Sequence, residues 1–260
     1  MLNKMVEGFA HRPGVHCESS ALRDIFEFHG FKFSEAMIFG LGSGLSFVYW
    51  HGKRTPYPFV GGRARDFCKN LCSNLGVPVR VNRTSSKTKA YEAMKNLISR
   101  NIPVMIHVDM PYLMYLGLPE QAHFGAHTIV VAGIDEDEGI AYIADTAFRD
   151  LQVATLKELE EARSSTFKPF PAENKCLAFE FPERMTRVEE AIRNAIVTTV
   201  ASMLHPPIKN LGVKGIDHFS DEIVTWPKLF PPEKPLSKQF YEVSYIMMEE
   251  DGTGGGLFRY

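Results

Sequence analysis

The stretch Gly14-Val15-His16-Cys17-Glu18-Ser19-Ser20 places a cysteine at the start of a predicted amphipathic helix. Cys17 lies in the first helical turn, where unpaired backbone N–H groups and the helix dipole favour a thiolate, the nucleophilic form of cysteine. A buried structural cysteine is the alternative interpretation. The helix is predicted from apolar residues at one-face spacing and from the glycine after them; these residues are Ala21, Leu22, Ile25, Phe26 and Gly30.

A β-hairpin is predicted further along the chain, because the apolar residues 126–134 and 139–145 flank the acidic run Asp135-Glu136-Asp137-Glu138. A turn centred on Glu136 places His127 directly opposite Asp145, with Cβ atoms about 4.5–5.5 Å apart. A slip of one residue would separate the two side chains onto different faces. The alternative is that this histidine and this aspartate are unrelated.

A rival histidine–aspartate pair precedes the hairpin. His107 and Asp109 point to the same face of a predicted strand over residues 102–108 and its end. With His123 they are also conceivable metal ligands, but no further ligand falls at a recognised spacing, so we expect no metal.

The chain order Cys17, His127, Asp145 is that of papain-like cysteine enzymes, in which a histidine activates a helix-borne thiol and a third side chain orients the histidine. Several stretches resemble the butirosin biosynthesis protein H family across nearly the whole chain. They are His16-Cys17-Glu18-Ser19-Ser20, residues 39–49 and the hairpin from His127 to Asp145, and more weakly residues 211–216, Trp226-Pro227 and residues 252–259.

This resemblance implies a papain-like α+β fold, with an N-terminal helix carrying the cysteine and an antiparallel sheet carrying the histidine and aspartate. The member that gives the family its name is an acyltransferase that moves an acyl group from a carrier-protein thioester to an amine of an aminoglycoside. The hairpin also resembles that of papain-fold peptidases that trim leader peptides from bacteriocins.

The oxyanion hole departs from the papain-like pattern. Such peptidases usually carry a glutamine several residues before the nucleophile, and no glutamine lies between Met1 and Cys17. We assign the role to His11, six residues upstream, with His16 as another available donor and the backbone N–H of Cys17 as the second donor. An ordinary surface position for His11 is the alternative.

Two further groups are candidate substrate contacts. Gly42 and Gly44 would allow close backbone approach beside the thiol, or simply form a tight structural loop. Tyr112 and Tyr115 belong to an aromatic stretch before His127 that either lines an acyl pocket or packs in the core.

The composition and charge of the chain argue against several classes of protein. A chain of 260 residues with 45% hydrophobic residues can bury a substantial core. The formal net charge of -2 gives no reason to expect nucleic acid or an acidic membrane as partner, and no run is long enough to span a bilayer. Four cysteines without disulfide-like density indicate a reducing cytoplasm. Cys68 and Cys72 lack a complementary pair for zinc and are expected in the core.

The domain organisation follows from the order of elements. Helices precede strands over residues 1–182, which we predict to be the papain-like catalytic domain. Residues 183–260 carry three amphipathic helices and are predicted to be a helical cap or the arm of a homodimer. The glycine-rich run Gly252–Gly256 is either an anion nest for a phosphate, such as that of phosphopantetheine, or a flexible connector.

We predict covalent acyl transfer. Cys17 attacks an acyl thioester, with an acyl carrier protein as the expected donor, His127 transfers the proton and Asp145 fixes the imidazole tautomer. The resemblance makes a small amine the acceptor, and no cofactor is expected apart from a phosphopantetheine-linked donor. A peptidase or amidase with the same triad is the first alternative, and a non-catalytic binding scaffold is the second.

Overall fold

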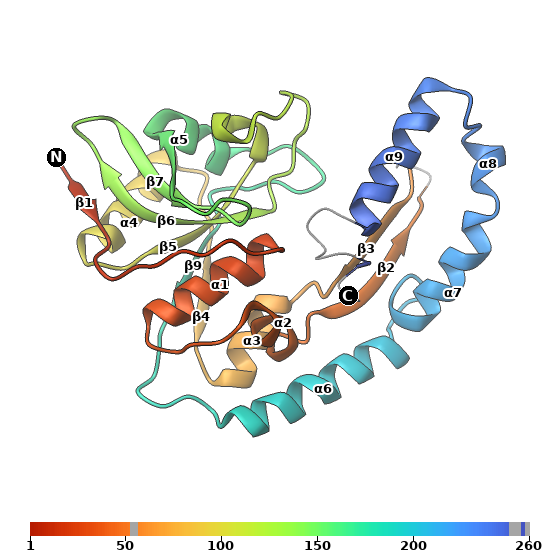
Figure 1. Ribbon diagram of the computed structural model, residues 1–260, viewed down its shortest axis with the longest axis horizontal. Coiled ribbons are helices and arrows are strands. Elements are labelled where there is room, and N and C mark those ends of the chain that lie inside the picture. The colour runs from red at the N-terminus through yellow and green to blue at the C-terminus, as the bar shows by residue number, and fades with distance from the viewer. Residues whose placement is uncertain (53–56, 250–255, 258–260) are drawn as a thin grey trace. The chain divides into compact units, whose positions relative to one another are not determined.

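The computed structural model describes residues 1–52, 57–249 and 256–257, and it divides into two compact units (Figure 1). The first unit comprises residues 1–35 and 77–183, and the second comprises residues 36–76 and 184–260. Most of the glycine-rich run at 252–256, together with the anion nest predicted there, lies outside the described residues. Within the described residues no helix is long and apolar enough to cross a membrane.

The first unit is built on a seven-stranded antiparallel sheet in the order β4-β9-β5-β6-β7-β8, with β1 pairing beside the end of β6. Helix α1 packs against β6, and helices α4 and α5 pack against β5. The strands are β1 (Asn3–Met5), β4 (Val79–Asn82), β5 (Val104–Val108), β6 (His127–Asp135), β7 (Ile140–Ala144), β8 (Gln152–Thr155) and β9 (Cys176–Phe179). The helices are α1 (Cys17–Phe28), α4 (Lys87–Ser99), α5 (Leu156–Ser164) and the 3-10 turns η1 (Met110–Tyr112) and η2 (Met114–Leu116).

The predicted α+β class is confirmed: an N-terminal helix begins at Cys17, and an antiparallel sheet carries His127 and, just past the end of β7, Asp145. The core behind this arrangement is apolar and closed. Every residue of β6 is buried, and Met94, Ile98 and Leu159 from α4 and α5 pack into the same cluster. Burial of each such side chain contributes about 1.5–3 kcal/mol, so the strand that carries His127 is rigidly held.

The predicted hairpin forms, but its predicted register is wrong. Continued one residue beyond β7, the observed register places Asp145 opposite Ile129 and not opposite His127, a shift of two residues. Because side chains alternate between the two faces, a two-residue shift keeps Asp145 on the face of His127. The two residues become diagonal neighbours, within reach of long side chains. The ladder pairs are Val130 with Ala144, Val131 with Ile143, Gly133 with Tyr142, Ile134 with Ala141 and Asp135 with Ile140.

The second unit combines helices with a two-stranded sheet. Its aromatic core includes Tyr49 from β2, which is fully buried and accepts a hydrogen bond from the indole of Trp226 at 3.4 Å, and Phe240 from α9, whose ring lies 5.0 Å from that of Trp226. The elements are α2 (Glu35–Leu41), β2 (Leu45–Trp50), β3 (Phe59–Arg63), α3 (Phe67–Leu75), α6 (Val188–Leu204), α7 (Gly212–Ile223), α8 (Trp226–Leu229) and α9 (Pro235–Glu249).

The compact units differ from the division expected from the sequence in one respect. The sequence predicted that residues 36–76 belong to the catalytic domain, whereas in the structure they belong with residues 184–260. The reason is long-range packing: β2 contacts α7, Ser43 donates to the carbonyl of Ala195 at 3.1 Å, and Asn210 donates to the carbonyl of Tyr49 at 2.8 Å. Roles of the second unit as a cap or a dimer arm stay predictions.

Candidate active site

The thiol of Cys17, the imidazole of His127 and the carboxylate of Asp145 form one hydrogen-bonded chain in the first unit. The Nε2 atom of His127 lies 2.9 Å from Oδ1 and 3.0 Å from Oδ2 of Asp145. The side chain of His127 also shares a hydrogen bond with that of Cys17. Cys17 is half-buried and reachable, whereas the other two residues are buried.

The charges and hydrogen bonds of these three side chains favour a protonated His127 beside an ionised Cys17. Burial by itself lowers the pKa of His127, but the hydrogen bonds and charges of Asp145 and Cys17 outweigh it and raise the pKa to about 10. Burial likewise raises the pKa of Asp145, but the contacts with His127, Tyr115 and the backbone of Thr146 together outweigh it, and the pKa ends below its ordinary value. At neutral pH the ring is therefore protonated beside a thiol that can ionise against it.

Asp145 is held by more than the imidazole. The hydroxyl of Tyr115 donates to its Oδ2 at 2.8 Å, and the backbone N–H of Thr146 donates to the same carboxylate. Burial, and then the charge of Asp145, raise the pKa of Tyr115, so this phenol stays a donor at any physiological pH. The ring of Phe148 meets that of Tyr115 edge-on at 5.5 Å. Tyr115, predicted as a pocket residue, thus fixes the carboxylate that fixes the imidazole.

The start of α1 is fixed by two polar residues. His16 is the N-cap: its Nδ1 accepts from the backbone N–H of Ser19 at 3.2 Å. The carboxylate of Glu35 accepts from the backbone N–H groups of Val15 and His16 at 3.0–3.2 Å and from the hydroxyl of Ser19 at 2.8 Å. His16 is thus a capping residue and not an oxyanion donor through Nδ1. Sequence reasoning missed Glu35, because its partners lie in a different element.

His11 does not take the oxyanion role expected for it. Its Nδ1 lies 2.6 Å from Oδ2 of Asp24, and its Nε2 faces the carbonyls of Phe148 and Asp145 at 3.0 and 3.2 Å. Burial lowers the pKa of His11, but Asp24 and the two carbonyls outweigh it and raise the pKa. Both ring nitrogens therefore donate to fixed acceptors. The residue ties α1 to the backbone at Asp145, and no N–H remains for a substrate.

Asp24 was also missed by sequence reasoning. Its second oxygen accepts from Nε and Nη2 of Arg23 at 3.0 and 2.9 Å, and both side chains are buried. Arg23 in turn donates to the carbonyl of Pro13 at 3.1 Å and to that of Arg12. The only signal in the sequence is a charged pair inside a helix that is otherwise mostly apolar. Together these contacts anchor the segment before Cys17.

The remaining predicted substrate contacts lie in separate settings. Gly42 and Gly44 belong to the second unit, where a Cβ would come within 2.3 Å of the ring of Phe67 and 2.5 Å of that of Phe39. These glycines are thus needed for close packing on aromatic rings. Tyr112 is partly buried against the core of the first unit.

The rival pair, His107 and Asp109, forms hydrogen bonds with other residues. His107 Nε2 accepts from Nζ of Lys175 at 3.0 Å. Asp109 is fully buried, and its carboxylate contacts His123 Nδ1 at 2.9 Å and accepts from the hydroxyl of Ser165 at 2.5 Å and the backbone N–H of Phe124 at 2.7 Å. Asp109 thus ties the loop that carries Tyr115 to the end of α5. Among the described residues no three His, Cys, Asp or Glu side chains are grouped to hold a metal ion.

The charged pair makes a prediction about labelling. At pH 6 iodoacetamide should alkylate Cys17 much faster than the other cysteines, because an imidazolium with a pKa of about 10 holds the thiolate, whereas free thiols ionise only near pH 8.5. The preference should shrink as pH rises and ordinary thiols ionise. Peptide mapping measures it, with His127→Ala as the control that removes the preference. Faster labelling of Cys68, Cys72 or Cys176 at pH 6 would contradict this expectation.

Comparisons with known proteins found two matching family profiles and a similar solved structure. Residues 16–146 match the family profile described as "Butirosin biosynthesis protein H, N-terminal", and residues 157–260 match a domain of unknown function, DUF4872. The curated proteins include no significant match. Among solved structures, the peptidase domain of Streptococcus ComA, a bi-functional ABC transporter involved in a quorum sensing pathway, is similar with a TM-score of 0.43. It shares 12% identity over 67% of this chain and 99% of that domain.

Proposed function

The chain belongs to the butirosin biosynthesis protein H family, and from this premise we propose that it is an acyltransferase that moves an acyl group from a thioester to an amine through Cys17. The class is that of a papain-like cysteine enzyme in biosynthesis. The observation that carries the proposal is the hydrogen-bonded chain from Cys17 through His127 to Asp145.

In the first half-reaction the thiolate of Cys17 attacks the carbonyl carbon of the donor thioester. The tetrahedral intermediate collapses, the C–S bond to the donor breaks, and the departing thiolate takes the proton from the imidazolium of His127. The products are an acyl-enzyme thioester on Cys17 and a neutral imidazole. We propose the backbone N–H of Cys17, at the first position of α1, as one donor to the oxyanion. Bonded on both ring nitrogens, His11 is not the other donor.

In the second half-reaction an amine attacks the acyl-enzyme and passes its proton to His127. The C–S bond to Cys17 breaks, the thiolate and imidazolium pair is restored, and the amide leaves. Asp145 holds one tautomer and orientation of the ring throughout, and Tyr115 and Thr146 hold Asp145. His127 thus carries the proton in both half-reactions while Asp145 keeps the ring oriented.

The donor and acceptor complete the proposal. A carrier protein bearing a phosphopantetheine-linked acyl group is the donor class, and a small amine is the acceptor class; both come from the family resemblance. Since a thiolate nucleophile requires a reduced cysteine, we place the reaction in a reducing compartment such as the cytoplasm. We expect neither nucleic acid nor a membrane as a partner, and homodimer formation stays a prediction.

Partition of the acyl-enzyme between water and amine tests this proposal. We expect an acyl thioester to give a Cys17 adduct that hydrolyses slowly and discharges quickly when the right amine is added. A bound, oriented amine reaches effective molarities of about 10⁵–10⁸ M, enough to outcompete bulk water. Intact mass with a panel of acyl thioesters, followed by candidate amines, measures both rates.

The same experiment separates the alternatives. An adduct that clears at one rate with and without every amine, together with cleavage of amide substrates, would assign a peptidase or amidase. No adduct with any thioester or amide, together with retained binding of an acyl carrier protein, would assign a binding scaffold. Either result would overturn acyl transfer.

A further inference from the structure

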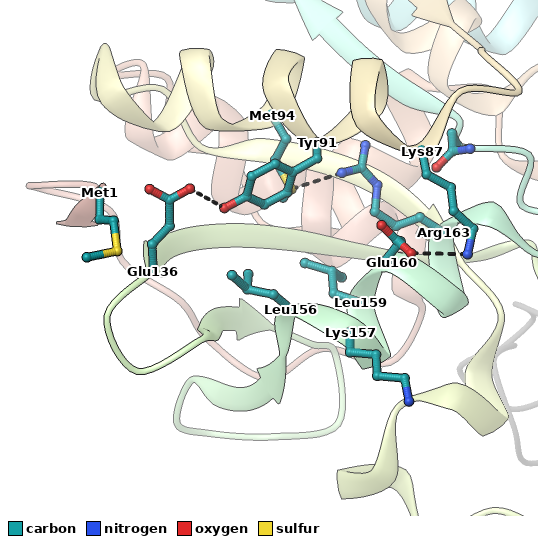
Figure 2. A pocket seen from close by; sticks show the side chains of 11 residues that line it. Met1, Lys87, Tyr91, Met94, Glu136, Leu156, Lys157, Leu159, Glu160 and Arg163 are labelled. Carbon is teal, nitrogen blue, oxygen red and sulfur yellow. Dashed lines mark hydrogen bonds and ion pairs between the residues drawn. The ribbon is translucent and has the colours of Figure 1, made fainter.

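A cavity of about 500 Å³ lies in the first unit, lined by residues of α4 and α5 (Figure 2). None of Cys17, His127 and Asp145 lines it, so it is separate from the candidate active site. Its volume is that of a site for a small organic molecule. Part of its wall is apolar, from Met94, Leu156 and Leu159.

The unusual feature of this cavity is Arg163, whose residue surface is only 3% exposed. Its Nη2 donates to the carbonyl of Ala90 at 3.2 Å and its Nη1 contacts the sulfur of Met94 at 3.3 Å, but its buried Nε has no hydrogen-bond partner. No carboxylate forms an ion pair with this guanidinium among the described residues. A buried cation without an anionic partner is destabilising by several kcal/mol, so the site lacks an anion.

The two carboxylates that line the cavity are already matched by other groups. Glu160 accepts from Lys87 at 3.1 Å, as the dashed line in Figure 2 shows. Glu136 accepts from Lys95 at 2.7 Å and from the hydroxyl of Tyr91 at 2.8 Å. Lys157 adds a further ammonium to the lining and has no ion pair in the part of the chain that the structure describes. The charge left unbalanced is therefore positive.

We propose that this cavity binds a small organic carboxylate. The carboxylate accepts hydrogen bonds from Nε and the adjacent amino group of Arg163, the planar edge that a guanidinium offers to a carboxylate. The apolar part of the ligand lies against Met94, Leu156 and Leu159, and Lys157 adds charge at the wall. The site is independent of the acyl-transfer reaction proposed above.

The wild-type protein tests the proposal with probes matched in length: hexanoate, hexanamide and hexylamine, with inorganic phosphate as the anion without an apolar part. Calorimetric titration and thermal unfolding should show that hexanoate binds and raises the Tm. Hexanamide and hexylamine should bind at least about tenfold more weakly, because only a carboxylate gains charge-assisted hydrogen bonds. Equal binding of hexanoate and hexanamide, or of hexanoate and phosphate, would overturn the proposal.

Variants locate the site. Arg163→Met should weaken hexanoate binding about tenfold or more, and Arg163→Lys should weaken it too, since lysine lacks the planar fork. The matched control is Arg80→Met, at an exposed arginine on β4 that pairs with Glu180 at 2.9 Å, and it should leave binding unchanged. Unchanged hexanoate affinity in folded Arg163→Met would overturn the assignment, and if that variant does not fold, the wild-type series decides alone.

Discussion

Cys17→Ala is expected to abolish the acyl-enzyme and lower turnover about 10⁴–10⁶-fold, the loss typical of removing the nucleophile of a triad. The reason is geometric: the thiol at the start of α1 is the group that shares a hydrogen bond with His127. Intact mass after incubation with an acyl thioester should show no added acyl group.

The matched control is Cys176→Ala, which removes a half-buried thiol from β9 and should leave acyl loading as in the wild type. Burial raises the pKa of the Cys176 thiol, so this residue is a poor nucleophile at neutral pH. An acyl adduct that survives in Cys17→Ala but disappears in another cysteine variant would withdraw the assigned nucleophile. Circular dichroism confirms that both variants are folded before rates are compared.

Asp145→Asn should lower the acylation rate about 10³–10⁴-fold while leaving the adduct detectable at long times. The nucleophile and the base remain, but the asparagine amide no longer favours one tautomer of the imidazole or its charged form. In the wild type that carboxylate is the group that raises the pKa of His127 most, against the effect of burial. Single-turnover rates by quenched mass analysis measure the effect.

Tyr115→Phe provides the comparison that separates charge from position. It removes one hydrogen bond to Asp145 but keeps the carboxylate, so the acylation rate should fall far less than in Asp145→Asn. His127 in Asp145→Asn should also lose its proton at a lower pH than in the wild type, which NMR titration of the ring detects. Equal acylation rates in Asp145→Asn and the wild type would show that the carboxylate does not orient the base.

The contact between His127 and Asp145 shows which features of the hairpin could be predicted from the sequence pattern. The hairpin and the shared face followed from alternation of side chains, but the turn centre was wrong. Beside the turn the ladder is shifted by three residues from the predicted register, and an irregularity between Val131 and Gly133 reduces the shift to two toward His127. Face depends only on whether a shift is even or odd, whereas facing pairs depend on the turn itself. The shared face of His127 and Asp145 therefore depends on the irregularity between Val131 and Gly133, because a shift of three residues continued to His127 would have placed the two side chains on opposite faces.

His11 is an example of a residue whose contacts cannot be predicted from sequence spacing. Its distance from Cys17 along the chain suggested an oxyanion donor, but its environment depends on Asp24 and on two carbonyls that lie more than a hundred positions away in the sequence. Local spacing carries no information about such partners. The short strands β1, β3 and β8 were not predicted either, because runs of three to five residues with polar or glycine positions give no clear period of two.

The second unit is built from two separate stretches of sequence, and this affects how it folds while the protein is being synthesised. Tyr49 emerges from the ribosome 177 residues before Trp226, the partner that its hydroxyl contacts in the core. At a translation rate of roughly 5–20 residues per second, about 10–35 s pass between the synthesis of Tyr49 and that of Trp226. Until Trp226 is synthesised, the apolar side chains of β2 lack the partners that bury them in the folded protein, so we expect a chaperone that shields them to raise the yield of folded protein.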